Sequence, residues 1–319
     1  MWPYCSQPLY ADGLPTIFNI TILNGYGIGG EIIDEPIFES FENEFDSFLD
    51  VHIEYSRRIW PWSGYLAVFI KINSKASNFN GIISAQIRLK VKTADKIDET
   101  TFKFRIKIIP TPSKSQRILW DQYRQMRYPP GYFARDNLEQ KNSPLDWNAD
   151  HPHTNFKNLY ENFRKNGYFI EISGHPLTCT NLSSYSTLFI VDPEEEFFPD
   201  ELTEIQKAVK FDGLNLIIFA DWFNSTLIKK IQFLDDNTGK LWFPETGGTN
   251  IPALNSLLNI FGFSFGDIIL NGKFEFGDSV INFLSGSTLI KAPKNGRLGF
   301  AKLDDIVSFV FMVLQNGIS

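Results

Sequence analysis

The chain has 319 residues, of which 43% are hydrophobic and 21% are charged, and its formal net charge is −7. This length favours two domains over one, and an acidic chain without clustered Lys and Arg argues against a nucleic-acid partner. The cysteines, Cys5 and Cys179, are too few for a disulfide-dense scaffold or a cysteine-based zinc cluster. A single bridge between them is an open alternative, but we favour two thiols that are free or separately paired, because their separation spans both predicted domains.

No targeting or membrane-spanning segment is predicted. Met1 is followed by neither a charged segment nor an apolar segment of the kind that forms a signal peptide. The longest apolar run, 306–314, is about half of the roughly 20 residues that a spanning helix requires. We therefore expect no transmembrane segment in this chain and read this run as a core element.

Residues 1–112 carry the pattern of an antiparallel β-sandwich. Apolar, aromatic or β-branched runs recur between clusters of Gly, Asn, Asp and Ser, at 16–23, 51–55, 65–72, 81–91 and 101–109. The last run places Phe102, Phe104, Ile106 and Ile108 at alternate positions, which is the period of a half-buried strand. Short strands without helices between them indicate a sandwich domain, which ends at the Pro-Thr-Pro of 110–112.

Residues 113–319 change to the pattern of an α/β domain. Predicted strands at 117–120, 168–172, 187–192 and 214–220 alternate with helices that begin near 156, at 199, at 225 and at 252. The run 214–220 is continuously apolar, which predicts a central strand buried on both faces. We predict a doubly wound α/β domain that resembles the flavodoxin-like and amidotransferase-like folds and is incomplete at its C-terminal end.

Five long motifs carry a more specific resemblance. They are CSQPLYADGLPT (5–16), IWPWSGYLA (59–67), KIIPTPSKSQRILWDQY (107–123), the aromatic and proline-rich run 117–156, and FPETGGTNIPALNSLL (243–258). In this order they resemble the site-1 protease family of subtilisin-like serine endopeptidases. The resemblance extends to about residue 295, and the residues after it match poorly.

The resemblance implies that this chain is the luminal region downstream of the catalytic domain. The expected location is the lumen of the endoplasmic reticulum and Golgi, and the expected partners are the catalytic domain in cis and luminal regulators or substrates. The complete enzyme would process membrane-bound transcription factor precursors, while this region braces the catalytic domain or docks partners. The alternative is a free-standing luminal binding module, and a less favoured one is an enzyme that uses the α/β domain.

No catalytic residue is predicted. A subtilisin triad needs motifs of the D-[ST]-G, H-G-T-H and G-T-S-x-A kind, and none occurs here. An amidotransferase-like domain would need a nucleophile in a tight strand-to-helix turn. The turn after 214–220 reads Asp-Trp-Phe-Asn (221–224), without Cys or Ser, and Cys179 lies in a predicted loop. We also predict no cofactor, because the glycine-rich run 24–30 is followed by no helix that could bind phosphate.

One group of residues has the composition of a metal site. Asp146, Asp150, His151 and His153 combine carboxylate and imidazole groups, but their spacing matches no standard ligand set. We favour a polar loop in which Asp150 or Thr154 caps the following helix, and so we predict no metal. The acidic run 194–196 is read as a solvated edge before a helix rather than an acid and base pair.

Three sequons are candidates for N-glycosylation at Asn19, Asn181 and Asn224. Asn181 falls in a predicted loop and is the best candidate, whereas Asn19 falls within a predicted strand.

A set of aromatic residues is the candidate for an interdomain or partner surface, because such side chains dominate binding hot spots. Its members are Trp60, Trp62, Tyr65, Tyr128, Tyr132 and Trp147. Of the two readings we favour packing between the domains.

Overall fold

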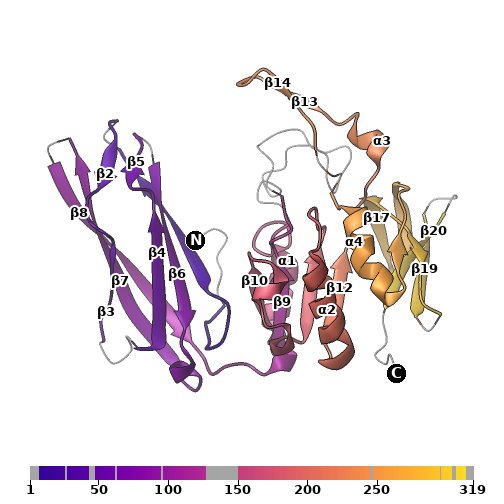
Figure 1. Cartoon of the computed structure of the whole chain (residues 1–319), viewed down its shortest axis with the longest axis horizontal. Helices are drawn as coiled ribbons and strands as arrows, with labels where there is room; N and C mark the ends of the chain where they lie inside the picture. Colours follow the sequence, from indigo (N-terminus) through magenta and orange to yellow (C-terminus); the bar gives the residue numbers. More distant parts are fainter. Residues whose placement is uncertain are drawn as a thin grey trace. The chain divides into compact units, whose positions relative to one another are not determined.

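The computed structural model describes residues 7–25, 27–42, 47–61, 63–94, 96–126, 150–244, 246, 248–294, 296–303 and 307–313 (Figure 1). The chain divides into two compact units, Met1–Ser113 and Lys114–Ser319, and each is described by itself. Among the described residues, no helix is long and apolar enough to cross a membrane.

The first unit consists of two antiparallel sheets. One sheet has the order β1 (Thr16–Leu23), β6 (Ser63–Ile72), β4 (Leu49–Tyr55). In the other, β7 (Gly81–Thr93) pairs along its whole length with β8 (Lys96–Ile108) and on its other edge with β2 (Gly30–Ile32) and β3 (Ile37–Ser40), while β5 (Arg58–Ile59) extends the sheet beside β2. The prediction of antiparallel sheets is confirmed. The pattern missed β2, β3 and β5, because strands of two to four residues are too short to show a period.

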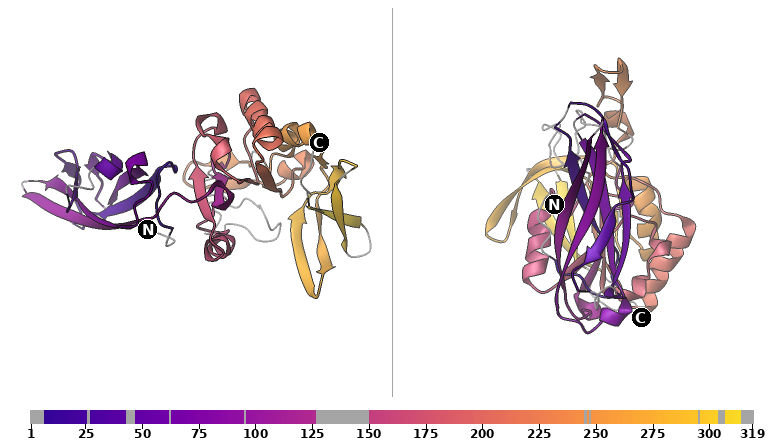
Figure 2. Two further views of the ribbon diagram at one scale, coloured as in Figure 1. Left: turned by 90° about the horizontal axis from the view of Figure 1, so that it is seen from below. Right: turned by 90° about the vertical axis from the view of Figure 1, so that its left-hand side faces the viewer.

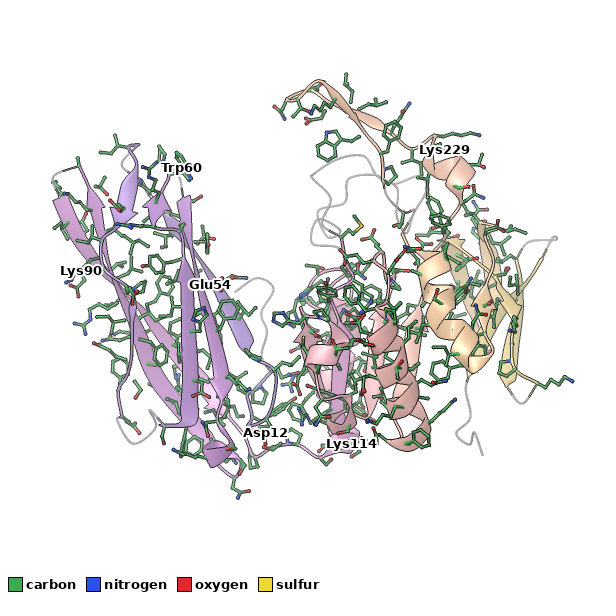
Figure 3. The ribbon with its side chains drawn as sticks, in the orientation of Figure 1. Asp12, Glu54, Trp60, Lys90, Lys114 and Lys229 are labelled. Atoms are coloured by element: carbon green, nitrogen blue, oxygen red, sulfur yellow. The ribbon has the colours of Figure 1, made fainter. Side chains whose placement is uncertain are left out.

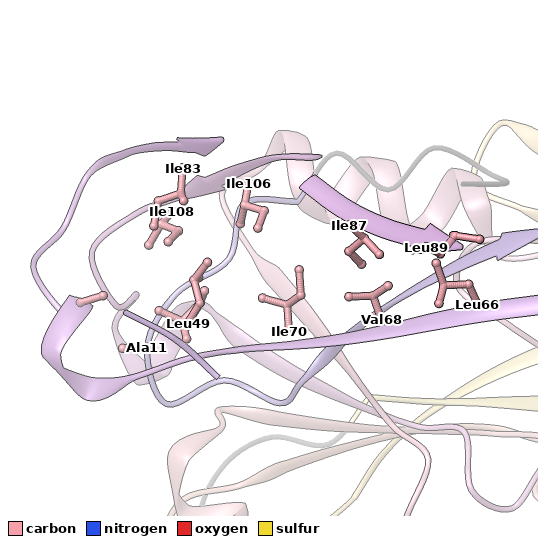
Figure 4. Close-up of a cluster of buried hydrophobic side chains, with 12 residues drawn as sticks. Ala11, Leu49, Leu66, Val68, Ile70, Ile83, Ile87, Leu89, Ile106 and Ile108 are labelled. Atoms are coloured by element: carbon pink, nitrogen blue, oxygen red, sulfur yellow. The ribbon is translucent and has the colours of Figure 1, made fainter. Parts of the chain in front are cut away.

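The core of this unit is an aliphatic layer between the sheets (Figure 4). Alternate residues of β6 and β7 face inward and are buried, namely Leu66, Val68, Ile70 and Ile72 on β6 and Ile83, Ala85, Ile87 and Leu89 on β7. Full burial of one such aliphatic side chain stabilises the folded state by about 1.5–3 kcal/mol. The period-two pattern of the sequence therefore has its cause in this one shared layer.

The second unit begins with a parallel sheet in the order β10 (Phe169–Ser173), β9 (Arg117–Asp121), β11 (Thr187–Val191), β12 (Asn215–Phe219). The helices α1 (Lys157–Lys165) and α2 (Pro199–Phe211) lie on opposite faces of it, which makes this part doubly wound as predicted (Figure 2). Gly167 and Gly213 follow the two helices with φ of 83° and 69°, a left-handed conformation that ends a helix at little cost for glycine.

Two predictions about this sheet are wrong. The run 214–220 is not a central strand, because β12 is the edge strand of the described sheet and its Phe219 is exposed. The helix predicted over 225–234 is only α3 (Ser225–Ile228), and the chain then forms a hairpin of β13 (Phe233–Asp235) and β14 (Lys240–Trp242). The Asp-Asp-Asn-Thr-Gly of 235–239 is turn chemistry that outweighs the weak helical period.

After α4 (Ile251–Leu258) the second unit is no longer α/β. It continues as antiparallel pairs of β15 (Ser264–Phe265) with β18 (Leu289–Lys291), β16 (Leu270–Phe276) with β17 (Ser279–Gly286), and β19 (Arg297–Leu303) with β20 (Val307–Val313). The prediction of a doubly wound domain to residue 319 is therefore wrong for this part. Within the apolar run at 306–314, Val307–Val313 forms β20, and the expected place of the run in a core stays a prediction.

Candidate functional site

The carboxyl ends of the parallel strands gather the buried polar side chains of the second unit. Asp121, Asp192 and Asp221 stand at the ends of β9, β11 and β12, and Glu194 and Glu201 lie in and after the turn that leads into α2. All five are buried. Open α/β sheets bind their ligands at this edge, so these five acidic residues, here named the carboxyl-edge cluster, form the candidate site.

Arg124 fills the centre of the carboxyl-edge cluster. Its side chain is fully buried, and its guanidinium forms ion pairs with the carboxylates of Asp121 and Glu201. The guanidinium carbon also lies 4.0 Å from the centre of the Phe197 ring. The Glu201 carboxylate further accepts hydrogen bonds from the backbone N–H groups of Leu177 (2.7 Å) and Phe198 (2.8 Å). A buried carboxylate that is satisfied in this way by three donors from three segments is held rigidly.

The remaining carboxylates are also occupied by donors of the protein. Glu194 accepts from the backbone N–H of Met126 (2.8 Å) and the Thr246 hydroxyl (3.1 Å), so the prediction of a solvated 194–196 edge is wrong for this residue. The Asp192 carboxylate accepts from the Thr249 hydroxyl and from the backbone N–H of Asp221, both at 2.5 Å. These bonds replace the water that a solvated carboxylate would keep.

Asp221 is held from two sides. The Ser285 hydroxyl donates to its carboxylate at 3.0 Å. Gly248, at φ 146°, lies so close that a Cβ there would meet the Asp221 Oδ2 at 2.9 Å, so only glycine fits.

The strained residue of the edge is Asp192. It has φ of 39°, which is uncommon for a residue other than glycine, and follows β11 directly. The turn after β12 is where an amidotransferase-like nucleophile would be expected, but the residue with positive φ, Asp192, follows β11, one strand earlier. The signal in the sequence is the Asp-Pro at 192–193, because a turn follows naturally where Pro fixes the next φ.

The electrostatics of the carboxyl-edge cluster follow from its burial. Desolvation raises the pKa of Asp121 from 3.8 to about 6; the charge of Arg124 opposes the shift and that of Glu201 adds to it. A second buried group lies deeper on the same sheet, where the Arg117 guanidinium pairs with Glu171 at 2.9 Å and the Tyr185 hydroxyl donates to Glu171 at 2.8 Å. Burial, together with Glu171, raises the pKa of Tyr185.

In this arrangement the polar side chains of the sheet edge bind one another, and these bonds stabilise the fold. The guanidinium of Arg124 pairs with the carboxylates of Asp121 and Glu201, and the hydroxyls of Ser285, Thr246 and Thr249 each donate to a carboxylate. A serine nucleophile instead needs a base that accepts its proton, oriented by a third group. The geometry of the described residues is that of an occupied site.

The predicted loop of Asp150, His151 and His153 is a compact turn. The Asp150 carboxylate accepts from the Asn155 amide, and His151 Nδ1 accepts the backbone N–H of His153 at 3.0 Å. Neither Asp150 nor Thr154 caps the helix, because α1 begins after Phe156 without a side-chain cap, so that prediction is wrong. Asp146 lies outside the described residues, within which no group of three His, Cys, Asp or Glu side chains is placed to hold a metal.

The three sequons lie in different surroundings. Asn19 is exposed on β1, and Asn181 is exposed in a turn where its side-chain oxygen accepts from the Ser183 hydroxyl at 2.7 Å. Asn224 is half-buried and caps α3, and its amide donates to the carbonyl of Asp267 at 3.2 Å. Cys179 is exposed and free, and Cys5 lies outside the described residues.

Two members of the predicted aromatic surface can be placed. Trp60 and Tyr65 are both exposed on the sandwich, with Trp60 in the loop between β5 and β6 (Figure 3). The Asn24 amide bridges the carbonyls of Ile28 (2.7 Å) and Trp60 (3.1 Å), which ties two loops together. Trp62, Tyr128, Tyr132 and Trp147 lie outside the described residues, so the role of the set stays a prediction.

Comparison with known proteins assigns both units. Two protein-family models match, "MBTPS1, third Ig-like domain" over residues 1–111 and "MBTPS1, fourth GATase-like domain" over residues 112–312. Membrane-bound transcription factor site-1 protease from Homo sapiens and from Mus musculus are each 45% identical over 305 residues. Subtilisin-like protease SBT6.1 from Arabidopsis thaliana is 43% identical over 304 residues. Each alignment covers 93% of this chain but 29% of the relative, so the chain spans less than a third of these relatives' length.

Replacement of Arg124 tests the carboxyl-edge cluster. We expect Arg124→Met to lower the free energy of unfolding of the second unit by about 3–5 kcal/mol, because it leaves two buried carboxylates without their cation. Urea unfolding measured by near-ultraviolet circular dichroism provides the value. The control is Arg57→Met, whose exposed pair with Glu31 should be worth less than about 1 kcal/mol. Equal effects of the two substitutions would contradict the role assigned to Arg124.

The pKa of Asp121 predicts a dependence of stability on pH. Because its folded pKa of about 6 lies above the ordinary 3.8, the folded state binds this proton more tightly, and the resulting stabilisation is lost as pH rises through that interval. Relative to Asp121→Asn, the unaltered chain should lose on the order of 2–3 kcal/mol between about pH 4 and pH 7. The Asn side chain of the variant does not titrate in this interval, so the difference in slope between the two stability curves is the measurement. Parallel stability curves would contradict the assignment.

Proposed function

Because this chain belongs to the site-1 protease (MBTPS1) family, we propose that it works as a non-catalytic region of a subtilisin-like serine protease, downstream of the catalytic domain. The description of its units as the third and fourth domains supports this place, since two domains then precede them in the family. The observation that carries the proposal is the carboxyl-edge cluster. The edge where an α/β sheet would bind a ligand is filled by Arg124 and its carboxylates.

In this proposal the region braces the catalytic domain and docks partners. Rigid units suit that task, because a surface that is already ordered loses little conformational entropy when it binds. The aliphatic layer orders the sandwich, and the buried ion pairs of Arg124 order the α/β sheet.

We infer the activity of the whole protein from the names of its relatives. Relatives called membrane-bound transcription factor site-1 protease support an enzyme that cleaves membrane-bound transcription factor precursors. They also support a place in the secretory pathway, with this region in the lumen of the endoplasmic reticulum and Golgi.

A luminal location predicts N-glycans on this chain. When the chain is exported through the secretory pathway of a eukaryotic cell, we expect sugars on Asn19 and Asn181, whose side chains are exposed. Mass spectrometry before and after removal of N-glycans by peptide N-glycosidase gives the occupied positions. The control is the pair of variants Asn19→Gln and Asn181→Gln, each of which should lose one glycan. A secreted chain that carries neither sugar would contradict this prediction.

A binding experiment tests the proposed function directly. We expect the whole chain to bind, in trans, a site-1 protease fragment that retains the catalytic domain but lacks the matching region, and to raise the thermal stability of that fragment. Titration calorimetry measures the affinity, and an unrelated Ig-like domain is the control. Absence of binding would favour the free-standing module. Labelling of the chain alone by a serine-directed fluorophosphonate would contradict its non-catalytic role.

A further inference from the structure

The hairpin of β13 and β14 projects from the second unit (Figures 1 and 2). Among the described residues these two strands pair only with each other. An isolated two-stranded hairpin is at best marginally stable in water, because it has no layer against which to bury a face. A projecting hairpin therefore needs either strong local bonds or a partner.

The turn of the hairpin is built from local bonds. The Asp235 carboxylate accepts from the Thr238 hydroxyl at 2.6 Å and from the backbone N–H of Asn237 at 3.1 Å. These bonds, with a smaller contribution from the Trp242 indole, hold the pKa of Asp235 below its ordinary value. Gly239, at φ 63°, closes the turn by donating to the Asp235 carbonyl at 2.7 Å. The turn is thus ordered and carries negative charge from Asp235 and Asp236.

The register divides the hairpin into two different faces. Asp235 lies opposite Lys240 and Phe233 lies opposite Trp242, so one face carries a charged pair and an aromatic pair. Leu234 lies opposite Leu241 on the other face, which Phe243 continues beyond the end of β14. That second face, here named the hairpin's apolar face, consists of Leu234, Leu241 and Phe243.

The hairpin's apolar face lies open to solvent. Leu234 is 57% exposed, Leu241 is 48% exposed and Phe243 is 50% exposed. Scattered exposed apolar residues are normal, but three on one face of a projecting ribbon form a patch of the kind that marks an interaction site. The ordered turn removes part of the entropy that binding would cost.

We propose that the hairpin's apolar face docks onto the subtilisin-like catalytic domain of the family's own polypeptide, and this rests on the proposed function. The relatives extend over more than three times the length of this chain, and two domains of the family precede its third and fourth. The occupant is drawn from the part of the relatives' polypeptide that lies outside the region matched here. A matching partner surface has a shallow apolar strip for this face and basic side chains beside the negative turn. Lys229 and Lys230, at the base of the hairpin, require acidic side chains on the partner (Figure 3).

A double substitution on this face tests the proposal. In the whole chain, Leu234→Ser with Leu241→Ser should weaken binding to the catalytic fragment at least about tenfold, because central apolar anchors carry most of the energy of an interface. The matched control is Val280→Ser with Ile290→Ser, which replaces two residues of the same unit that are 68% and 70% exposed and should leave the affinity unchanged. A second measurement is hydrogen exchange of residues 233–242, whose amides should become protected in the complex.

The outcomes separate this proposal from the one on which it rests. If the hairpin variant binds the catalytic fragment as tightly as the unaltered chain does, and the amides of 233–242 are not protected, the docking face is wrong and the proposed function still stands. Failure of the unaltered chain to bind overturns both. Equal weakening by the control pair would show a general loss of surface contacts and would also overturn the assignment to the hairpin.

Discussion

The buried ion pairs of Arg124 are the constraint on which the second unit depends. They join the end of β9, through Asp121, to the first turn of α2, through Glu201. The carbonyl of Arg124 also accepts the backbone N–H groups of Glu194 (3.0 Å) and Glu195 (3.3 Å), so the same residue fixes the turn after β11. Removing charges from water costs several kcal/mol for each ion, and only complete pairing offsets that cost. Strand, turn and helix must therefore hold their positions together.

Aromatic packing stabilises the face of the parallel sheet that α1 covers. Trp120, Phe189 and Phe219 come from three neighbouring strands, with ring centres 5.7 Å apart for Trp120 and Phe189 and 6.1 Å apart for Phe189 and Phe219. On the α1 side, the ring centre of Phe156 lies 5.3 Å from that of Trp120, and the ring centre of Phe163 lies 5.5 Å from that of Phe189. Trp120 and Phe156 come from the two ends of the aromatic run 117–156. The aromatic richness that identifies the family in the sequence thus serves, at both ends, to attach α1 to the sheet.

The predictions succeeded where one layer imposes a regular period and failed where distant segments compete. The run 81–91 follows one buried face, so β7 could be predicted closely from sequence, and so could the start of α1 near residue 156. The run 214–220 is as apolar as a central strand, although β12 is the edge strand of the described sheet. Nothing within the run indicates this position, because the position depends on which other strands pair with β12. Glu194 lies in a run of three acidic residues, and only the positions of Met126 and Thr246 show that one of them is buried.

By itself the sequence determined the family, the antiparallel strands of the first unit, the parallel sheet that begins the second, and the absence of the subtilisin motifs, because local period and motif identity do not depend on how the chain closes. The tertiary structure decided what the acidic residues do. Carboxylates that are separated by up to 100 residues in the chain meet at one sheet edge, where burial, the guanidinium of Arg124 and the donors of neighbouring segments make them interactions that hold the fold. Burial and pairing are properties of several segments at once, and so no window of sequence contains them.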